Sequence, residues 1–103
     1  MKRVFITQSN PKLNLLAASA FGELIEVLPA SSNIIYNAGN TVEKIKQELA
    51  DFDDGDYLLP VGAPAIMLVC GSVAAKNNSG RYKVLTWDRQ ESMYYSIDID
   101  LLA

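Results

Sequence analysis

The feature that most constrains this chain is an uncharged run of nineteen residues from Tyr57 to Ala75. Its length is close to the roughly 20 residues that a membrane-spanning helix needs. Two prolines and Gly62 interrupt the run, however, where a strand would pass through a turn into a helix. The run therefore predicts a buried strand over Tyr57–Val61 and a helix over Pro64–Lys76, and we do not expect a membrane span.

The predicted helix Pro64–Lys76 is apolar on nearly every face, so we expect it to be sandwiched inside the protein or at a dimer interface. Half of the 103 residues are hydrophobic, which is rich for a chain of this size. This surplus favours a homodimer, in which a second copy covers part of the surface. The length is typical of one domain, and we expect residues 1–103 to form a single α/β domain.

Hydrophobic periodicity predicts the remaining elements. They are strands over Arg3–Thr7, Glu23–Leu28, Lys83–Asp88 and Tyr94–Leu101, a brief helix within Lys12–Ala20, and a helix that begins at Asn40. Asn40 and Glu43 have the spacing of a capping box at the start of that helix. Because Pro60 cannot donate to a ladder, the strand that contains it should lie at an edge or end early.

The last predicted strand alternates along its length. Its apolar face carries Tyr95, Ile97, Ile99 and Leu101, a pattern typical of a half-buried antiparallel strand. The earlier strands are separated by helices, which indicates right-handed parallel crossovers. The predicted fold is therefore α/β: a small Rossmann-like layered sheet, mostly parallel βαβαβ, with a C-terminal antiparallel hairpin strand.

The predicted ligand site lies beyond the carboxyl ends of the parallel strands, where open sheets of this kind bind their ligands. Backbone N–H groups and the helix dipole at a strand–glycine–helix corner can hold a phosphate or carboxylate. The candidate ligand-binding residues at these ends are Ser9, Asn10, Gly62, Asp88 and Arg89. They predict a site for a nucleotide or another anion.

Two of these features also have plain structural interpretations. Gly62 can bring backbone N–H groups to a ligand, or it can simply be a turn that needs no ligand. Trp87, Asp88 and Arg89 can clamp a planar anion, or they can be a core tryptophan followed by an Asp–Arg pair that closes a hairpin. The sequence favours the second interpretation of each feature.

The composition argues against most catalytic and metal chemistry. The chain has no histidine, and its single cysteine, Cys70, lies in an apolar stretch and is expected to be a buried hydrophobe in a reducing compartment. The acidic residues from Glu48 to Asp56 lack calcium-loop spacing and indicate a solvated turn. The basic residues are scattered, which disfavours nucleic acid. We expect no cofactor and no metal, and a cytoplasmic protein, because the N-terminus lacks a signal-peptide pattern.

Three segments together are similar to small uncharacterised proteins of bacteriophage genomes: Met1–Gln8 (MKRVFITQ), Asp56–Pro64 (DYLLPVGAP) and Val84–Arg89 (VLTWDR). The resemblance implies expression in a bacterial cytoplasm and no known activity. The strand–glycine–helix segment also resembles Rossmann-like nucleotide-sensing domains, although it lacks their fuller polar, glycine-rich loop.

Two functions stay open at this point. The leading hypothesis is a non-enzymatic binding or interaction module, a phage accessory protein that acts on a host factor. The alternative is a small-molecule binding domain, with a nucleotide or another anion bound at the carboxyl ends of the parallel strands.

Overall fold

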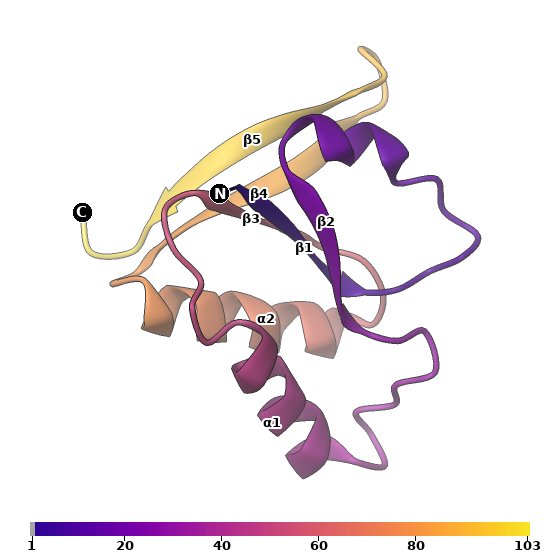
Figure 1. The fold of residues 1–103 in the computed structure, drawn as a ribbon, viewed down its shortest axis with the longest axis vertical. Coiled ribbons are helices and arrows are strands. Elements are labelled where there is room, and N and C mark those ends of the chain that lie inside the picture. Colours follow the sequence, from indigo (N-terminus) through magenta and orange to yellow (C-terminus); the bar gives the residue numbers. More distant parts are fainter. Residues whose placement is uncertain (1) are drawn as a thin grey trace.

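The computed structural model describes residues 2–103 of the chain and has a mixed α/β architecture (Figure 1). In chain order the elements are β1 (Arg3–Gln8), a 3-10 helix η1 (Leu16–Ala20), β2 (Glu23–Leu28), α1 (Ala38–Glu48), β3 (Asp56–Leu59), α2 (Pro64–Asn77), β4 (Arg81–Asp88) and β5 (Met93–Asp100). Every predicted helix and strand has a counterpart, with boundaries that differ by a few residues.

The five strands form one sheet in the order β2-β1-β3-β4-β5. Neighbouring strands from β2 to β4 run parallel, and β5 is antiparallel to β4. The mostly parallel sheet with an antiparallel C-terminal strand is therefore confirmed. The chain leaves β1 toward one edge to form β2, and then crosses back to form β3 on the other side of β1, so the strand order reverses between β1 and β3.

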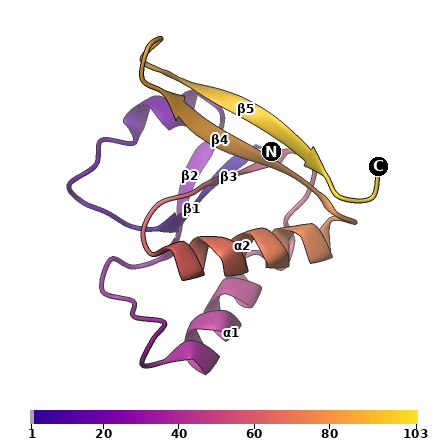
Figure 2. The same ribbon diagram turned by 180° about the vertical axis from the view of Figure 1, so that it is seen from behind.

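The two faces of the sheet are covered unequally. Helices α1 and α2 lie on one face, and η1 lies on the other (Figures 1 and 2). Right-handed crossovers that move in opposite directions place their connections on opposite faces. Strand β1 alternates accordingly, because Phe5 packs with Ile45 and Ile66 below the helices, whereas Val4 packs with Ala18 of η1.

Strand β3 is central and ends early, at Leu59. Pro60 follows it and has no N–H to donate. Beyond this point the hydroxyl of Thr7 connects β1 to the segment that follows β3. It donates to Val61 O at 2.5 Å and accepts from Val61 N at 2.8 Å. Thr7 is 1% exposed, so this side chain replaces buried backbone pairing.

Helix α1 begins earlier than predicted. Its first residue is Ala38 and Asn37 is its cap, so Asn40 lies inside the first turn and the predicted capping box with Glu43 is wrong. Ile45 in the helix and Leu49 directly after it form an apolar stripe that is fully buried. Burial of that stripe fixes the helix, and tertiary packing outweighs a local cap.

Helix α2 is covered on one side rather than sandwiched. Pro64 occupies its first turn, as predicted, and Cys70 lies on its buried face. Leu68 on the outer side is 73% exposed. Burial raises the pKa of the Cys70 thiol to about 12, in agreement with a structural cysteine. Among residues 2–103, no helix has both the length and the apolar character needed to cross a bilayer.

Strand β5 does not bury the apolar face that its alternation predicts, and its one buried side chain, Tyr94, lies on the other face. Tyr95 and Ile97 are 47% and 46% exposed, whereas Tyr94 is only 9% exposed. Tyr94 packs with Leu85 on the η1 face. Tyr95 and Ile97 stay exposed because β5 is an edge strand, and α2 packs on β1 and β4 instead of covering it.

Candidate functional site at the carboxyl edge of the sheet

The corner between β3 and α2 is closed by the side chain of Gln8. Its Oε1 accepts a hydrogen bond from Ala63 N at 2.9 Å, and its Nε2 donates to Ser32 O at 3.0 Å. Gly62 has a φ of +98°, and a Cβ atom there would overlap the Gln8 amide. The amide of Gln8 therefore bridges the segments after β2 and β3 at the point where the strand order reverses.

Three of the other candidate residues make hydrogen bonds that hold the ends of their strands. Ser9 N donates to Leu28 O at 2.8 Å and extends the pairing of β1 with β2. Asn10 Oδ1 accepts from Lys12 N at 3.0 Å, and Asp88 Oδ1 accepts from Gln90 N at 2.9 Å inside the β4–β5 hairpin. The role of the candidate residues toward a ligand stays a prediction.

The same candidates form two groups. Ser9 and Asn10 follow β1, whereas Asp88 and Arg89 follow β4. Because β3 lies between these strands, the two groups are about 10 Å apart at the sheet edge, two strand spacings. Gly62 lies between them, after β3. All five residues are on the carboxyl edge, as the sequence predicts, but they line it rather than converge on one point.

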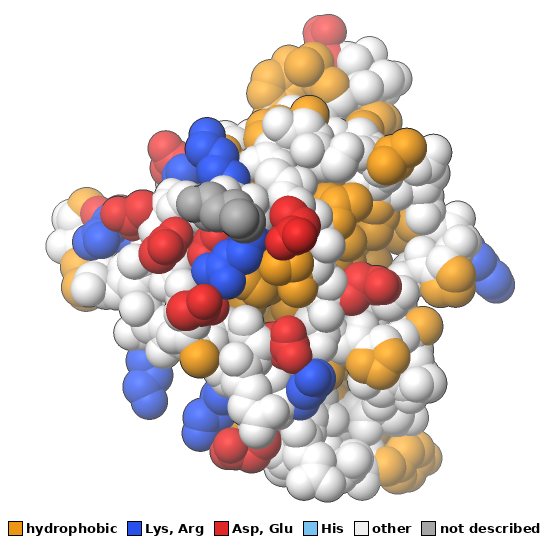
Figure 3. All heavy atoms as spheres, in the orientation of Figure 1, with side chains coloured by type: hydrophobic (Ala, Val, Ile, Leu, Met, Phe, Trp, Pro, Cys, Tyr) orange, Lys and Arg blue, Asp and Glu red, His pale blue; other side chains and the backbone are white. Residues whose placement is uncertain are grey.

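An apolar hollow opens at this edge, on the η1 face. Its volume is about 500 Å³, within the range of small-molecule pockets. The lining residues come from the β1–η1 segment, the end of β3, β4 and the start of β5: Leu13, Asn14, Leu15, Leu59, Pro60, Val61, Leu85, Thr86, Trp87 and Tyr94. Figure 3 shows hydrophobic side chains gathered near the centre of the molecular surface.

Trp87 is the most exposed aromatic side chain of this hollow. It is 46% exposed, so the interpretation as a core tryptophan is wrong. Its ring meets Tyr94 edge-to-face, with 4.9 Å between centroids, and Tyr94 takes the buried place beside Leu85. The salt bridges within residues 2–103 do not include the expected Asp88–Arg89 pair; Asp88 caps the hairpin instead.

The hollow is electrostatically neutral. Within the described chain, no Asp, Glu, Lys or Arg side chain lines it. The amide oxygen of Asn14 accepts from Leu16 N at 3.1 Å, so this polar atom is already occupied by the backbone. An ion bound here would lose water without gaining a counter-charge. The arrangement is suited to an uncharged apolar group, for which burial against Trp87 and the leucines is favourable.

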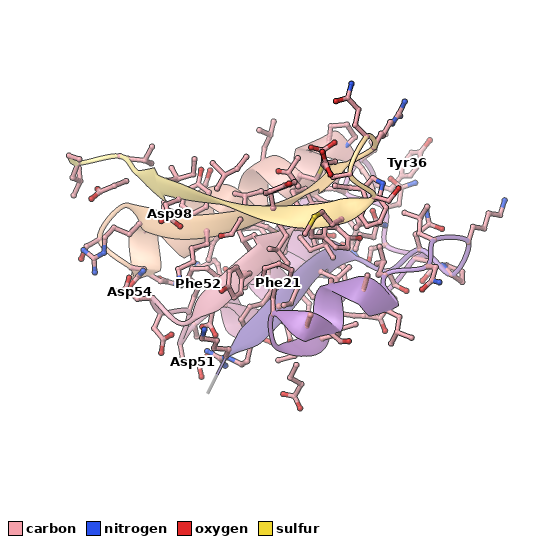
Figure 4. All side chains as sticks on the ribbon, turned by 90° about the horizontal axis from the view of Figure 1, so that it is seen from above. Phe21, Tyr36, Asp51, Phe52, Asp54 and Asp98 are labelled. Atoms are coloured by element: carbon pink, nitrogen blue, oxygen red, sulfur yellow. The ribbon has the colours of Figure 1, made fainter. Side chains whose placement is uncertain are left out.

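The opposite end of the sheet collects the charges. Asp51, Asp54 and Asp98 lie together at this end (Figure 4), beside a hollow of about 340 Å³. Hydrogen bonds from Asn78 and Arg81 hold the pKa of Asp54 below its usual value. Among residues 2–103, no group of three or more acidic, cysteine or histidine side chains is arranged to hold a metal ion.

The acidic turn before β3 contains a buried ion pair that the sequence reasoning missed. Asp56 is fully buried, and Arg3 reaches it with Nε at 3.0 Å and a terminal nitrogen at 2.7 Å. Asp53 N also donates to Asp56 at 2.9 Å. The turn is therefore only partly solvated. The available signal was a charged residue, Arg3, inside an otherwise apolar strand, because such a residue needs a partner when it is buried.

The fold and this edge define a small α/β protein with a mixed five-stranded sheet and a charge-free hollow beside its parallel strand ends. No curated protein and no solved structure matches the chain. The family model described as phage Pam3 gp32-like protein matches residues 2–101, and the chain therefore belongs to this family. The match confirms the resemblance to small phage proteins.

Proposed function

We propose that this phage protein is a non-enzymatic binding module, and that its hollow receives an uncharged apolar group about the size of an aromatic ring. The observation that carries the proposal is the charge-free lining of a hollow of about 500 Å³ beside the half-exposed Trp87. A protein partner that inserts an apolar side chain is one source of such a group, and a small molecule is the other.

The position of the hollow supports this proposal. We interpret the sheet as Rossmann-like, since its strand order reverses between β1 and β3, and sheets of this kind bind ligands beyond the carboxyl ends of their strands. The hollow lies at that end of β3 and β4. Gln8 already fills the corner at the reversal itself, so the free space is displaced by one strand toward β4.

The nucleotide or anion site remains the alternative, with Ser9, Asn10, Gly62, Asp88 and Arg89 around it. It would rely on N–H donors at the start of α2. Ala63 N already donates to Gln8, and Pro64 has no N–H. These two facts favour the apolar site over the anion site.

The family membership suggests the setting. We place the protein in the bacterial cytoplasm, as a phage accessory protein that engages a host factor through this edge. In this setting the apolar group is a side chain of the host protein.

Trp87 is the single tryptophan of the chain, so its fluorescence reports on the hollow directly. Titration with benzyl alcohol should shift its emission saturably to shorter wavelength, because the ligand removes water from the indole. Leu13→Asp places a charge in the lining and should abolish the shift. Ile35→Asp, at a loop position that is 80% exposed, is the matched control and should retain it.

Two further titrations separate the possible ligands. A blocked tripeptide with a central phenylalanine should bind more tightly than benzyl alcohol if a protein is the partner, and no more tightly if a small molecule is. Inorganic phosphate should have no effect. A saturable response to phosphate, with none to benzyl alcohol, would contradict the proposal and support the anion site.

A further inference from the structure

Within residues 2–103, strand β5 lies at one end of the sheet and its outer backbone edge is unpaired. It is eight residues long and its neighbour in the sheet is β4. Leu101 N donates to Gly80 O at 2.9 Å, and hydrogen-bonded pairs alternate along an antiparallel ladder. Odd-numbered residues of β5 therefore bond to β4, while the N–H and C=O groups of Ser96 and Asp98 face outward. Such an edge is a template for another strand.

The side chains of this edge are apolar on the face that α2 shares. Met93, Tyr95 and Ile97 are each 46–47% exposed. The helices leave this part of the sheet uncovered, because α2 packs on β1 and β4 (Figure 2). The opposite edge of the sheet, β2, carries the exposed acidic residues Glu23 and Glu26, a common protection against edge pairing.

We propose that β5 pairs with β5 of a second copy, antiparallel, about a two-fold axis at Ile97, to form a continuous ten-stranded sheet. An axis perpendicular to the sheet keeps residues of the same face opposite one another. Ile97 then meets Ile97 of the second copy, and Tyr95 of each copy lies opposite Ile99 of the other. These apolar pairs are the ones that stabilise antiparallel strands.

The charges of β5 are compatible with this register. Asp98 of each copy lies opposite Ser96 of the other, which offers a hydroxyl donor, and Asp100 lies opposite Tyr94, so no carboxylate is opposed by another. An axis at Asp98 or at Ile99 would oppose carboxylates directly, which is unfavourable. Within one copy, Lys83 stands opposite Asp98 and Arg81 stands opposite Asp100 in the β4–β5 register, so each carboxylate has a basic residue on the neighbouring strand.

In this register the two Ile97 side chains lie where the two β5 strands bring facing side chains closest together. Because the outward backbone groups belong to even-numbered residues, the Ile97 pair is a non-hydrogen-bonded pair, in which the side chains are nearest. The β5 edge is therefore self-complementary: in this register its apolar residues meet apolar residues of the second copy, and its carboxylates meet no carboxylate. This favours a second copy of the chain over an unrelated strand as the partner.

The test measures the oligomeric state of the full chain by sedimentation velocity at micromolar concentration. Wild type should sediment as a dimer, and Ile97→Lys, which opposes two ammonium groups at the axis, should raise the dimer dissociation constant by about tenfold or more. Ile35→Lys, a matched change at an exposed loop position, should leave the dimer intact. Circular dichroism confirms that each variant is folded.

A covalent variant tests the register. Ile97→Cys should form an intermolecular disulfide on mild oxidation, since the two side chains meet at the axis, and Ser96→Cys should not. A monomeric wild type, an Ile97→Lys dimer of unchanged affinity, or cross-linking through Ser96→Cys alone would overturn the proposal. The fluorescence response of Trp87 to benzyl alcohol, measured in the Ile97→Lys variant, tests the binding hollow independently of the dimer. A retained response in a monomer would leave the proposed function intact whatever the oligomeric state.

Discussion

The side-chain amide of Gln8 occupies the space that a Cβ atom at Gly62 would need. A Cβ built on Gly62 would lie 2.9 Å from Gln8 Cδ and closer still to the amide oxygen. The φ of +98° at Gly62 turns the chain so that Ala63 N points at this oxygen, 2.9 Å away. Glycine and glutamine together close the corner at which the strand order reverses, and the free space of the edge lies beside Trp87 instead.

Replacement of Gly62 by alanine should destabilise the protein. The new methyl group meets Gln8, and a non-glycine residue at this φ carries strain of about 1–3 kcal/mol. Urea unfolding followed by circular dichroism measures the loss. Gly39→Ala is the matched control, because Gly39 lies in α1 and a Cβ there meets nothing within 4 Å; it should be neutral or stabilising by up to about 1 kcal/mol. Equal stability of the two variants would contradict the packing described for Gln8.

The Arg3–Asp56 pair should contribute much more to stability than the exposed pairs. Asp56→Ala leaves the Arg3 guanidinium without its buried partner, and breaking a buried pair in this way costs about 3–5 kcal/mol. Because Arg3 also bonds Asp51, the lower end of that range is expected. Chemical denaturation provides the measurement.

Asp54→Ala is the control for this pair. Asp54 meets Arg81 at 3.2 Å in an exposed setting, where water screens the interaction. Its loss should leave the denaturation midpoint close to that of the wild type. A comparable loss in both variants would show that the turn itself, and not the buried pair, determines stability.

The hydroxyl of Thr7 should be required, and the rest of its side chain should not. Thr7→Val preserves the shape but leaves the buried Val61 N–H and C=O without their partner, at a cost of about 1–3 kcal/mol. Thr7→Ser retains the hydroxyl and should lose less. Hydrogen exchange at the Val61 amide gives a local readout, with faster exchange expected in Thr7→Val alone.

Cys70 should make stability fall at alkaline pH. Burial raises its pKa to about 12 in the folded protein, from an ordinary value of 9.0. Above pH 9 the unfolded chain therefore holds fewer protons than the folded one, so this contribution to stability is intact below pH 9 and is lost as the pH rises toward 12, at up to about 1.4 kcal/mol per pH unit. Cys70→Ala removes this slope. Urea titrations of both proteins in reducing buffer, compared across this range, isolate the thiol from the other titrating groups.

Much of the fold could be predicted because its elements are marked by strong local patterns. One uncharged run could be divided into a strand, a turn and a helix because it is interrupted by Pro60, Gly62 and Pro64. The parallel crossovers followed from the alternation of strands and helices. The start of α1 could not be predicted in the same way, because the burial of Ile45 and Leu49 decides it more than the capping potential of Asn40 does.

The faces of β5 and the closed corner depend on long-range packing, which local sequence does not reveal. Alternation in β5 separated its apolar side chains from its polar ones, but which side chains are buried depends on the coverage provided by η1 and α2, and only Tyr94 is buried. Likewise, Gln8 is 54 residues away from Gly62 in the chain, and nothing in its neighbourhood indicates that its amide fills a turn. The edge of the sheet was predicted, whereas the hollow beside Trp87 was not, since four separate segments build it.

Assigned amide NMR spectra with two probes, benzyl alcohol and inorganic phosphate, test the central claim most directly. The proposed site predicts that benzyl alcohol shifts the Trp87 indole N–H and the amides of Leu13 and Thr86 saturably, and that phosphate leaves Gly62 and Ala63 unchanged. Saturable phosphate shifts at Gly62 and Ala63, with no response of Trp87 to benzyl alcohol, would contradict the account.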